Sequence, residues 1–254
     1  MILILVIVLI IIVYFFFIKK KNKVITKAIP EHWHNLLLEN VLFYKKLDKE
    51  NQLYFRQMVQ QFLNDVHVEA VEFEIEELDR LLVAASAVIP VFGFENWNYP
   101  NIKTVLIYPD YFNEDLEFHS KAKNKNIGGL VGNGRFDNQM ILSRRALHHG
   151  FTNKTDKGNT GIHEFVHLLD KLDGKIDGIP SKLMDNKNIM LWLDLIHDKM
   201  EAINNNKSDI RNYGGTSKEE FFTVASEYFF ERPMLLKRKH PKLYKMLSEC
   251  FNFV

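Results

Sequence analysis

The hydrophobic pattern begins with a long uninterrupted apolar run. Residues 1–18 read MILILVIVLIIIVYFFFI, without a charge or a helix breaker, and a membrane span needs about 20 such residues. Lysines follow at once in the segment 19–23, whereas a secretory signal peptide carries its positive charge before the apolar run. We therefore predict an uncleaved single-pass transmembrane anchor over 1–18 and a basic juxtamembrane linker over 19–30 that contacts lipid headgroups. Because positive flanks stay on the cytoplasmic side, the remaining domain, 31–254, is predicted to face the cytoplasm.

Beyond the linker, several stretches have helical spacing. Apolar residues at mixed helical intervals predict a helical pair between residues 31 and 65. The i, i+3, i+4, i+7 spacing over residues 78–89 predicts a helix that Pro90 and Gly93 close. From residue 155 onward the pattern is mostly helical.

Other stretches have strand spacing. Alternation predicts a strand over residues 66–75, and shorter apolar runs predict strands over 103–108 and 139–143. The glycine-rich segment 126–134 indicates a loop or bulge. Strands in the first part of the domain and helices after them are typical of the α+β class.

One predicted helix carries two histidines on one face. His163 and His167 enclose the sequence HEFVH, and helix positions four apart lie one turn apart. Both imidazoles can therefore reach one metal ion. The alternative is a surface helix that carries these residues by chance. Against it stands an apolar stripe on the other face, which would pack on the core: Ile162, Phe165, Val166 and Leu169.

A zinc site of this kind needs a third protein ligand and keeps a further position open for water. Residues 216–231 predict a strong helix in which Glu220 and Glu227 lie seven apart on one face. Spacing alone leaves both glutamates open as the third ligand. Asp170 lies on the histidine face of the first helix, where it could accept the second N–H of a ligating imidazole and orient the ring.

The start of the second helix also fits a capping box, which joins Thr216 with Glu219 or Ser217 with Glu220. A box uses only one glutamate, so the first pairing leaves Glu220 free. Helix capping and metal binding are therefore compatible interpretations of this segment.

Composition narrows the classes of partner and site. The 254 residues are 46% hydrophobic and 26% charged, an ordinary globular balance. Lysine and arginine (33) nearly cancel aspartate and glutamate (32), so no net field indicates nucleic acid as a partner. The single cysteine, Cys250, excludes both an internal disulfide and a cysteine-based zinc site.

Several stretches resemble the MtfA family, also called the Mlc titration factor A or glucose-regulated metallopeptidase family. The resemblance lies in LLVAASAVIPVFGFENW (81–97), VLIYPDYF (105–112), HEFVHLLDKLDGKIDGIP (163–180) and YGGTSKEEFFTVASEYFFERPMLLKRKHPKLY (213–244). It covers most of the chain after the predicted anchor. Since the catalytic core of the family is similar to that of anthrax lethal factor, the resemblance implies a zincin-like metallopeptidase fold. The anchor is an addition to the family pattern.

The resemblance also implies the ligands. It implies one zinc ion per chain, held by His163, His167 and Glu220, and so favours Glu220 over Glu227 as the third ligand. Glu227 then becomes a candidate to support a ligand from behind.

The implied activity is that of a membrane-anchored zinc metallopeptidase acting on a peptide or protein substrate. The resemblance implies Glu164 as the general base for a zinc-activated water. It places a catalytic tyrosine seven residues before the ligand glutamate, at Tyr213. The alternative is a zinc-binding regulatory protein that sequesters a transcriptional repressor at the membrane. The peptidase is favoured, because a binding module has no need of Glu164 and Tyr213 beside three ligands.

Overall fold

The computed structural model describes most of the chain: residues 28–132, 134–153 and 156–253. The chain divides into two compact units, 1–30 and 31–254, and every element below belongs to the second. Within the described residues, no helix is both long and apolar enough to cross a membrane. The predicted anchor over 1–18, and the predicted linker as far as residue 27, lie outside the described residues. Membrane attachment therefore stays a prediction of the sequence.

The predicted helical pair at the start of the domain is in fact three helices: α2 (His32–Asn40), α3 (Leu42–Lys45) and α4 (Lys49–Asp65). Asp48 explains where α4 begins, because its side chain accepts a hydrogen bond from the backbone nitrogen of Asn51 at 2.8 Å. Tyr44 and Phe55 lie on the buried face of these helices and pack in the core.

A sheet of four strands follows, in the order β1-β2-β4-β3. β1, β2 and β4 are parallel, and β3 runs antiparallel to β4 at the edge. The strands predicted over 103–108 and 139–143 are confirmed to within a residue. The strand predicted over 66–75 is too long, since the chain turns at Glu72, whose φ is +63°. The strands are β1 (His67–Ala70), β2 (Thr104–Tyr108), β3 (Gly129–Val131) and β4 (Gln139–Ser143).

β3 lies inside the segment for which the sequence predicts only a loop or bulge, so that prediction is wrong at residues 129–131. Glycine is depleted in strands, so the glycines of this segment argue against a strand, and β3 is not predicted from the sequence. Gly129 nevertheless fits its place. A Cβ at this position would lie 2.5 Å from Cγ and Oε1 of Glu164, so glycine leaves room for the Glu164 side chain between β3 and the histidine-bearing helix.

The central helices continue the fold: α5 (Glu77–Val91), α6 (Arg144–Thr152) and α7 (Thr160–Asp170). α5 passes through Pro90, where the sequence predicts its end, because a proline in the last turn removes only one helical hydrogen bond. Helices also precede the first strand, and α5 connects β1 with β2. The α+β class is supported, but strands and helices interleave instead of following one another.

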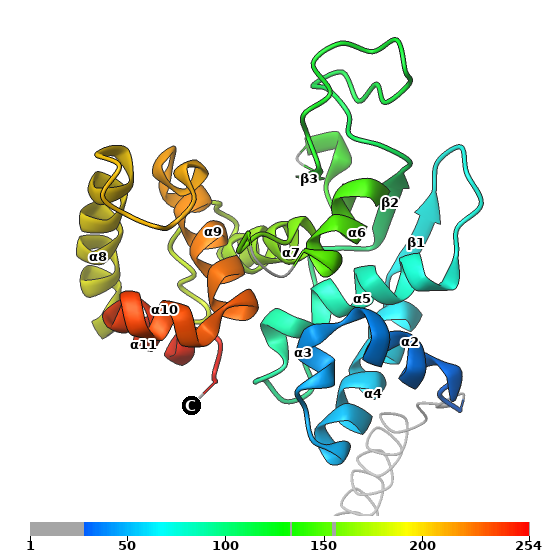
Figure 1. Ribbon diagram of the computed structural model, residues 1–254, viewed down its shortest axis with the longest axis horizontal. Helices are drawn as coiled ribbons and strands as arrows, with labels where there is room; N and C mark the ends of the chain where they lie inside the picture. Colours follow the sequence, from blue (N-terminus) through cyan, green and yellow to red (C-terminus); the bar gives the residue numbers. More distant parts are fainter. Residues whose placement is uncertain (1–27, 133, 154–155, 254) are drawn as a thin grey trace, which may run out of the picture. The chain divides into compact units, whose positions relative to one another are not determined.

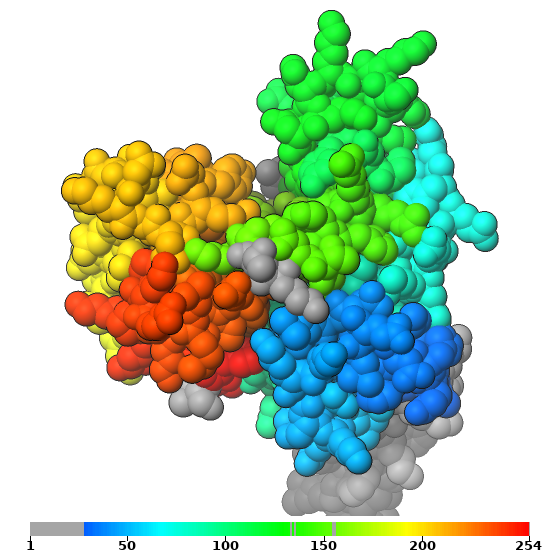
Figure 2. All heavy atoms as spheres, in the orientation of Figure 1, coloured from blue at the N-terminus to red at the C-terminus, as the bar shows by residue number. Residues whose placement is uncertain are grey.

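α7 is the element on which the site depends. It contacts α5, α6 and β3, and it also contacts α9 (Lys218–Glu231) (Figure 1). The remaining helices are α8 (Asn186–Asn204), α10 (Pro233–Lys239) and α11 (Pro241–Cys250), with 3-10 turns η1 (Gly134–Phe136), η2 (Lys171–Asp173) and η3 (Asn212–Gly215). The molecular surface has a hollow between two segments, the green one that follows β2 and the orange one that precedes α9 (Figure 2).

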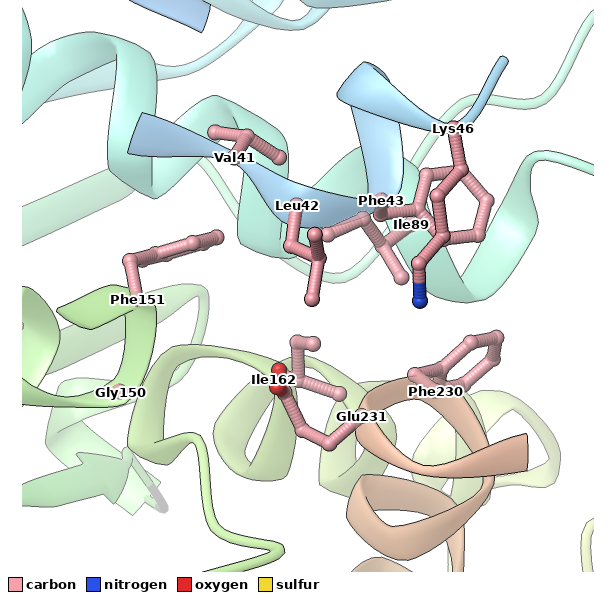
Figure 3. Close-up of a pocket in the computed structure, with 10 residues that line it drawn as sticks. All are labelled: Val41, Leu42, Phe43, Lys46, Ile89, Gly150, Phe151, Ile162, Phe230 and Glu231. Carbon is pink, nitrogen blue, oxygen red and sulfur yellow. The ribbon is translucent and has the colours of Figure 1, made fainter. Parts of the chain in front are cut away.

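The predicted apolar stripe of α7 is confirmed as core: Ile162, Phe165, Val166 and Leu169 are all buried. A small cavity borders Ile162, and Glu231 at the end of α9 lies at its wall (Figure 3). The carboxylate of Glu231 accepts a hydrogen bond from Nδ2 of Asn159 at 3.3 Å. Burial raises the pKa of Glu231 to about 7, against the effect of the Asn159 amide and with a smaller contribution from Glu227.

Candidate metal centre and active site

α7 and α9 bring together three side chains that could hold a metal ion. Nε2 of His163 lies 3.1 Å from Oε2 of Glu220, and Nε2 of His167 lies 3.6 Å from Oε1 of the same carboxylate. One ligand atom from each residue lies within 4.8 Å of the others. Over the described part of the chain, no other trio of His, Cys, Asp or Glu side chains meets at one point in this way.

Local sequence places Glu220 at the histidines. Ser217 is the N-cap of α9, since its Oγ accepts a hydrogen bond from the backbone nitrogen of Glu220 at 3.3 Å. In a full capping box the Glu220 carboxylate would bond back to the cap. Here that carboxylate contacts the histidines of α7. The apolar face of α9 packs in the core and is buried throughout: Phe221, Val224, Ala225, Tyr228 and Phe229.

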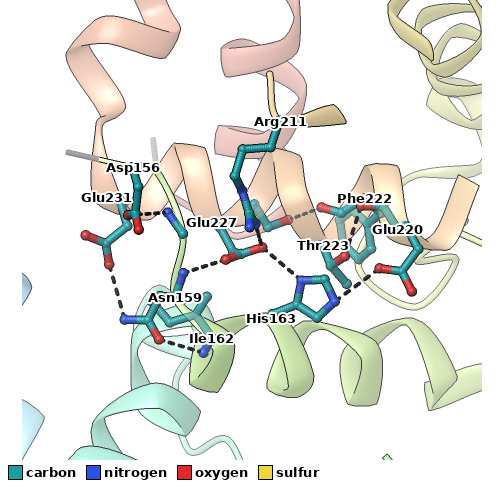
Figure 4. A network of polar contacts seen from close by, with 12 residues as sticks. Asp156, Asn159, Ile162, His163, Arg211, Glu220, Phe222, Thr223, Glu227 and Glu231 are labelled. Atoms are coloured by element: carbon teal, nitrogen blue, oxygen red, sulfur yellow. Dashed lines mark hydrogen bonds and ion pairs between the residues drawn. The ribbon is translucent and has the colours of Figure 1, made fainter. Parts of the chain in front are cut away.

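Glu227, two turns farther along α9, contacts the other side of the same imidazole (Figure 4). Its side chain is 2% exposed, and its Oε1 lies 2.8 Å from Nδ1 of His163. Its Oε2 accepts a hydrogen bond from the backbone nitrogen of Asn159 at 2.5 Å. A carboxylate only accepts hydrogen bonds, so Nδ1 of His163 is the donor. In the neutral ring Nε2 then carries the lone pair, and that lone pair faces Glu220.

The contact of His163 with Glu220 therefore joins two acceptors and needs a cation. A proton is one such cation. Burial alone would lower the pKa of His163, but the carboxylates of Glu227 and Glu220 outweigh it and raise that pKa to about 10. Burial would raise the pKa of Glu220, yet the two histidines hold it well below its usual range. A zinc ion fits the same place, because two imidazole nitrogens and a carboxylate are a zinc donor set.

Glu164 lies beside these ligands and faces a cleft. Its residue is 6% exposed, and burial raises the pKa of its carboxyl, opposed by the charges of His163 and His167. A carboxyl with a raised pKa is suited to general-base work near neutral pH. The cleft has a volume of about 400 Å³. Its walls include Tyr111, Asn126, Ile127, Gly128, Gly129, Thr160, Arg211 and Tyr213.

Tyr213 stands on the turn η3 at the mouth of this cleft. Its residue is 50% exposed, and its ring centre lies 6.0 Å from that of His163, with 31° between the planes. Burial and the nearby Glu220 carboxylate raise the pKa of the Tyr213 hydroxyl to about 12. The hydroxyl therefore keeps its proton at neutral pH and can donate a hydrogen bond.

Asp170, at the end of α7, contacts the loop that follows the helix. It is 1% exposed, and its Oδ2 accepts a hydrogen bond from the backbone nitrogen of Gly178 at 2.8 Å. Burial raises its pKa to about 6, against the effect of that bond. Among the described residues, Nδ1 of His167 and Oδ1 of Asp170 are both buried without a hydrogen-bond partner. Pairing of Asp170 with a ligand imidazole therefore stays a prediction.

Arg211 is the site residue that sequence reasoning misses. Its guanidinium contacts Oε1 of Glu227, the oxygen that also bonds His163 (Figure 4). It lies on the segment before Tyr213 and lines the cleft. Its partner Glu227 lies on another element, so the sequence does not show that the two residues meet. In the sequence, Arg211 is marked only by its position two residues before Tyr213.

Comparison with known proteins agrees with this geometry. Residues 16–252 match the family described as "Glucose-regulated metallo-peptidase M90". An uncharacterized protein of Synechocystis sp. is 27% identical over 244 residues, covering 90% of this chain and 86% of its own length. Mlc titration factor A of Pectobacterium atrosepticum is 24% identical over 233 residues (87% and 86%). The protein of that name in Escherichia fergusonii is 26% identical over 236 residues (89% and 86%).

Proposed function

The chain belongs to the MtfA family of glucose-regulated metallopeptidases, and from this premise we propose that it is a zinc metallopeptidase that hydrolyses peptide bonds. The observation that carries the proposal is the meeting of His163, His167 and Glu220 at one point, with Glu164 buried beside them at a cleft. Metallopeptidases combine three ligands with an adjacent carboxylate base in this manner.

The metal site is built by residues with distinct roles. His163, His167 and Glu220 would hold the zinc ion. When bound, zinc supplies Lewis acidity, which polarises a carbonyl and brings the pKa of water to about 7. Glu227 keeps the N–H of His163 on Nδ1, so that the Nε2 lone pair is directed toward Glu220 and the metal position.

Glu164 would carry out the proton transfers, and Tyr213 would supply a hydrogen bond. The Glu164 carboxylate takes the proton of the attacking water and passes it to the leaving amine. The Tyr213 hydroxyl donates a hydrogen bond to the carbonyl oxygen as that oxygen gains charge. Both groups line the same cleft. The raised pKa of each suits its role, because a higher pKa makes Glu164 a better proton acceptor, and Tyr213, with a pKa of about 12, keeps its proton at neutral pH.

The free edge of the sheet supports a peptide as the substrate. β3 is one of the two edge strands of the sheet, and β1 is the other. The backbone nitrogen of Gly132 donates a hydrogen bond to the carbonyl of Gln139, and that of Ser143 donates one to the carbonyl of Gly128. In and next to β3, residues 128, 130 and 132 therefore face β4. In an antiparallel ladder the alternate residues point outward, so the backbone groups of Gly129 and Val131 face away from the sheet. An extended peptide added there would pass beside Glu164, against which Gly129 lies.

The test uses the full-length protein and a mixed peptide library read by mass spectrometry. We expect cleavage by the zinc-loaded wild type, loss of cleavage on chelation, and recovery when zinc is restored. The Glu164→Gln variant keeps the size of the side chain and removes the base, so it should remain inactive with zinc present. Equal cleavage by this variant and the wild type would overturn the assignment of Glu164.

The name of these relatives, Mlc titration factor A, supports a second candidate function. In that alternative the chain acts by binding and sequestering a transcriptional repressor. Glu164→Gln separates the two functions, since a binding role survives loss of the base and a hydrolytic role does not. A zinc-loaded wild type that cleaves no library peptide would favour the binding function.

A further inference from the structure

Arg211 lies where three segments of the site meet. Its guanidinium contacts the buried carboxylate of Glu227 on α9. That carboxylate also bonds the ring of His163 and the backbone nitrogen of Asn159, the N-cap of α7. One carboxylate therefore joins α9, the start of α7 and the segment that leads to Tyr213 (Figure 4).

The same segment has a second anchor at Asp209. Oδ2 of Asp209 accepts hydrogen bonds from Nζ of Lys157 at 2.7 Å and from the hydroxyl of Tyr228 at 2.8 Å. Its Oδ1 lies 2.7 Å from Nε2 of His240. Tyr228 directly follows Glu227 in α9. Asp209 and Arg211 thus attach the segment before η3 to two neighbouring residues of α9, Tyr228 and Glu227.

Burial holds Tyr213 only in part, so its position also involves its contact with Glu220 and the anchors of the segment before it. Half of its surface is exposed. Its turn begins at the carbonyl of Arg211, which accepts a hydrogen bond from the backbone nitrogen of Gly214 at 3.0 Å. On the far side the turn is attached to α8, since Nδ2 of Asn204 donates a hydrogen bond to the carbonyl oxygen of Gly215 at 3.1 Å. The near side, toward α7, is held through Arg211.

We propose that Arg211 is a positioning residue, which through Glu227 holds the turn of Tyr213 against α7 and so keeps the tyrosine hydroxyl at the reacting carbonyl. The proposal rests on the proposed function, in which Tyr213 acts during hydrolysis. It gives Arg211 a role distinct from binding substrate, although the residue borders the cleft. It also gives a reason for the position of the Arg211 guanidinium, which contacts Oε1 of Glu227, the same oxygen that bonds Nδ1 of His163.

Kinetics of three variants test this role. Arg211→Gln should lower kcat by about 10–100-fold, since a displacement of about 1 Å costs up to about 10²-fold, while KM changes by less than about threefold. Arg211→Lys keeps the charge without the planar fork and should recover part of kcat. In a Tyr213→Phe background, Arg211→Gln should cost less than about twofold more, because both changes remove one contribution. Losses that multiply fully would overturn the proposal.

Arg144→Gln is the matched control. Arg144 also pairs with a buried carboxylate, that of Asp79, at 2.8 Å, but on helices α6 and α5 outside the cleft lining. Like Arg211→Gln, this variant removes an arginine from a buried carboxylate that keeps a histidine partner, since Oδ1 of Asp79 also lies 2.6 Å from Nε2 of His148. It does so without releasing the Tyr213 turn. Its kcat should stay within about twofold of the wild type. An equal loss of kcat in both arginine variants would mean that the effect is one of stability, and would overturn the proposal.

Hydrogen exchange in the metal-free full-length protein tests the proposal independently of hydrolysis. The amides of Gly214 and Thr216 report on the turn, because they bond the carbonyls of Arg211 and Tyr213. Arg211→Gln should speed their exchange by about tenfold or more, and Arg144→Gln should not. Unchanged exchange in Arg211→Gln would overturn the positioning role even if the wild type is an active peptidase. A wild type without peptidase activity, but with faster exchange in Arg211→Gln, would overturn the proposed function alone.

Discussion

Replacing Gly129 with alanine should separate catalysis from folding and from metal binding. An added Cβ would lie 2.5 Å from Cγ and Oε1 of Glu164 and 2.7 Å from its Cδ. Carbon atoms in contact stand about 3.5–4.0 Å apart, so the carboxylate must move by about 1 Å. The clash involves the outer atoms of a side chain, and the backbones of β3 and α7 can keep their places.

We expect kcat/KM of Gly129→Ala to fall by about 10²-fold, because a displacement of this size at a reacting group costs about that much. The zinc content should stay at one ion per chain, since the three atoms nearest to the added Cβ all belong to Glu164. The free energy of unfolding should fall by only about 1 kcal/mol, the cost of moving one side chain off its rotamer.

Three measurements on the full-length protein decide this prediction: initial rates of peptide hydrolysis, metal content by elemental analysis, and urea unfolding. Gly128→Ala is the neighbouring control, because its Cβ would meet Cβ of Ala146 at 3.0 Å and not Glu164. It should lose far less activity. Full activity in Gly129→Ala would refute the reasoning, since Glu164 would then tolerate a displacement that a general base cannot.

Three further substitutions test other parts of the site. Tyr213→Phe should lower kcat by about 10²–10³-fold, the usual effect of losing one oxyanion donor, with zinc retained in the same sample; an unchanged kcat would remove the hydroxyl from the mechanism. His163→Ala should lose zinc on elemental analysis, and chelation, which lowers the melting temperature of the wild type, should leave this variant unaffected. Glu231 has a folded-state pKa of about 7, above its unfolded value of about 4.3, so the folded state binds more protons between these pH values and the wild type loses stability as pH rises through them. Glu231→Gln should therefore be more stable than the wild type by about 1–3 kcal/mol at pH 8 and by much less at pH 5; urea unfolding at both pH values measures this, and a difference that does not change with pH would contradict it.

The sequence predicts the elements whose apolar stripes are local. α7 and α9 show helical spacing over their own lengths, so their buried faces, and with them the faces of His163 and Glu220, follow from the pattern. The resemblance to the MtfA family, which the match over residues 16–252 confirms, then names one glutamate. Spacing could not choose between Glu220 and Glu227, because both reach the same imidazole, one at each ring nitrogen.

The rest of the site depends on contacts between distant segments. β3 is absent from the prediction because its glycines contradict strand propensity, and the reason for Gly129 is a side chain 35 positions away in α7. Arg211 is absent because its partner Glu227 belongs to another element. For Asp170 the structure shows a hydrogen bond to the Gly178 backbone where helical spacing suggests a histidine, since spacing along one helix contains no information about the loop that covers it.

The most direct test of the central claim is a paired measurement of zinc content and peptide hydrolysis in full-length wild type and Glu164→Gln. The account predicts one zinc ion per chain in both proteins and cleavage by the wild type alone, because the variant keeps His163, His167 and Glu220 and loses only the base. A well-folded wild type without zinc, or a Glu164→Gln variant that cleaves as fast as the wild type, would contradict it.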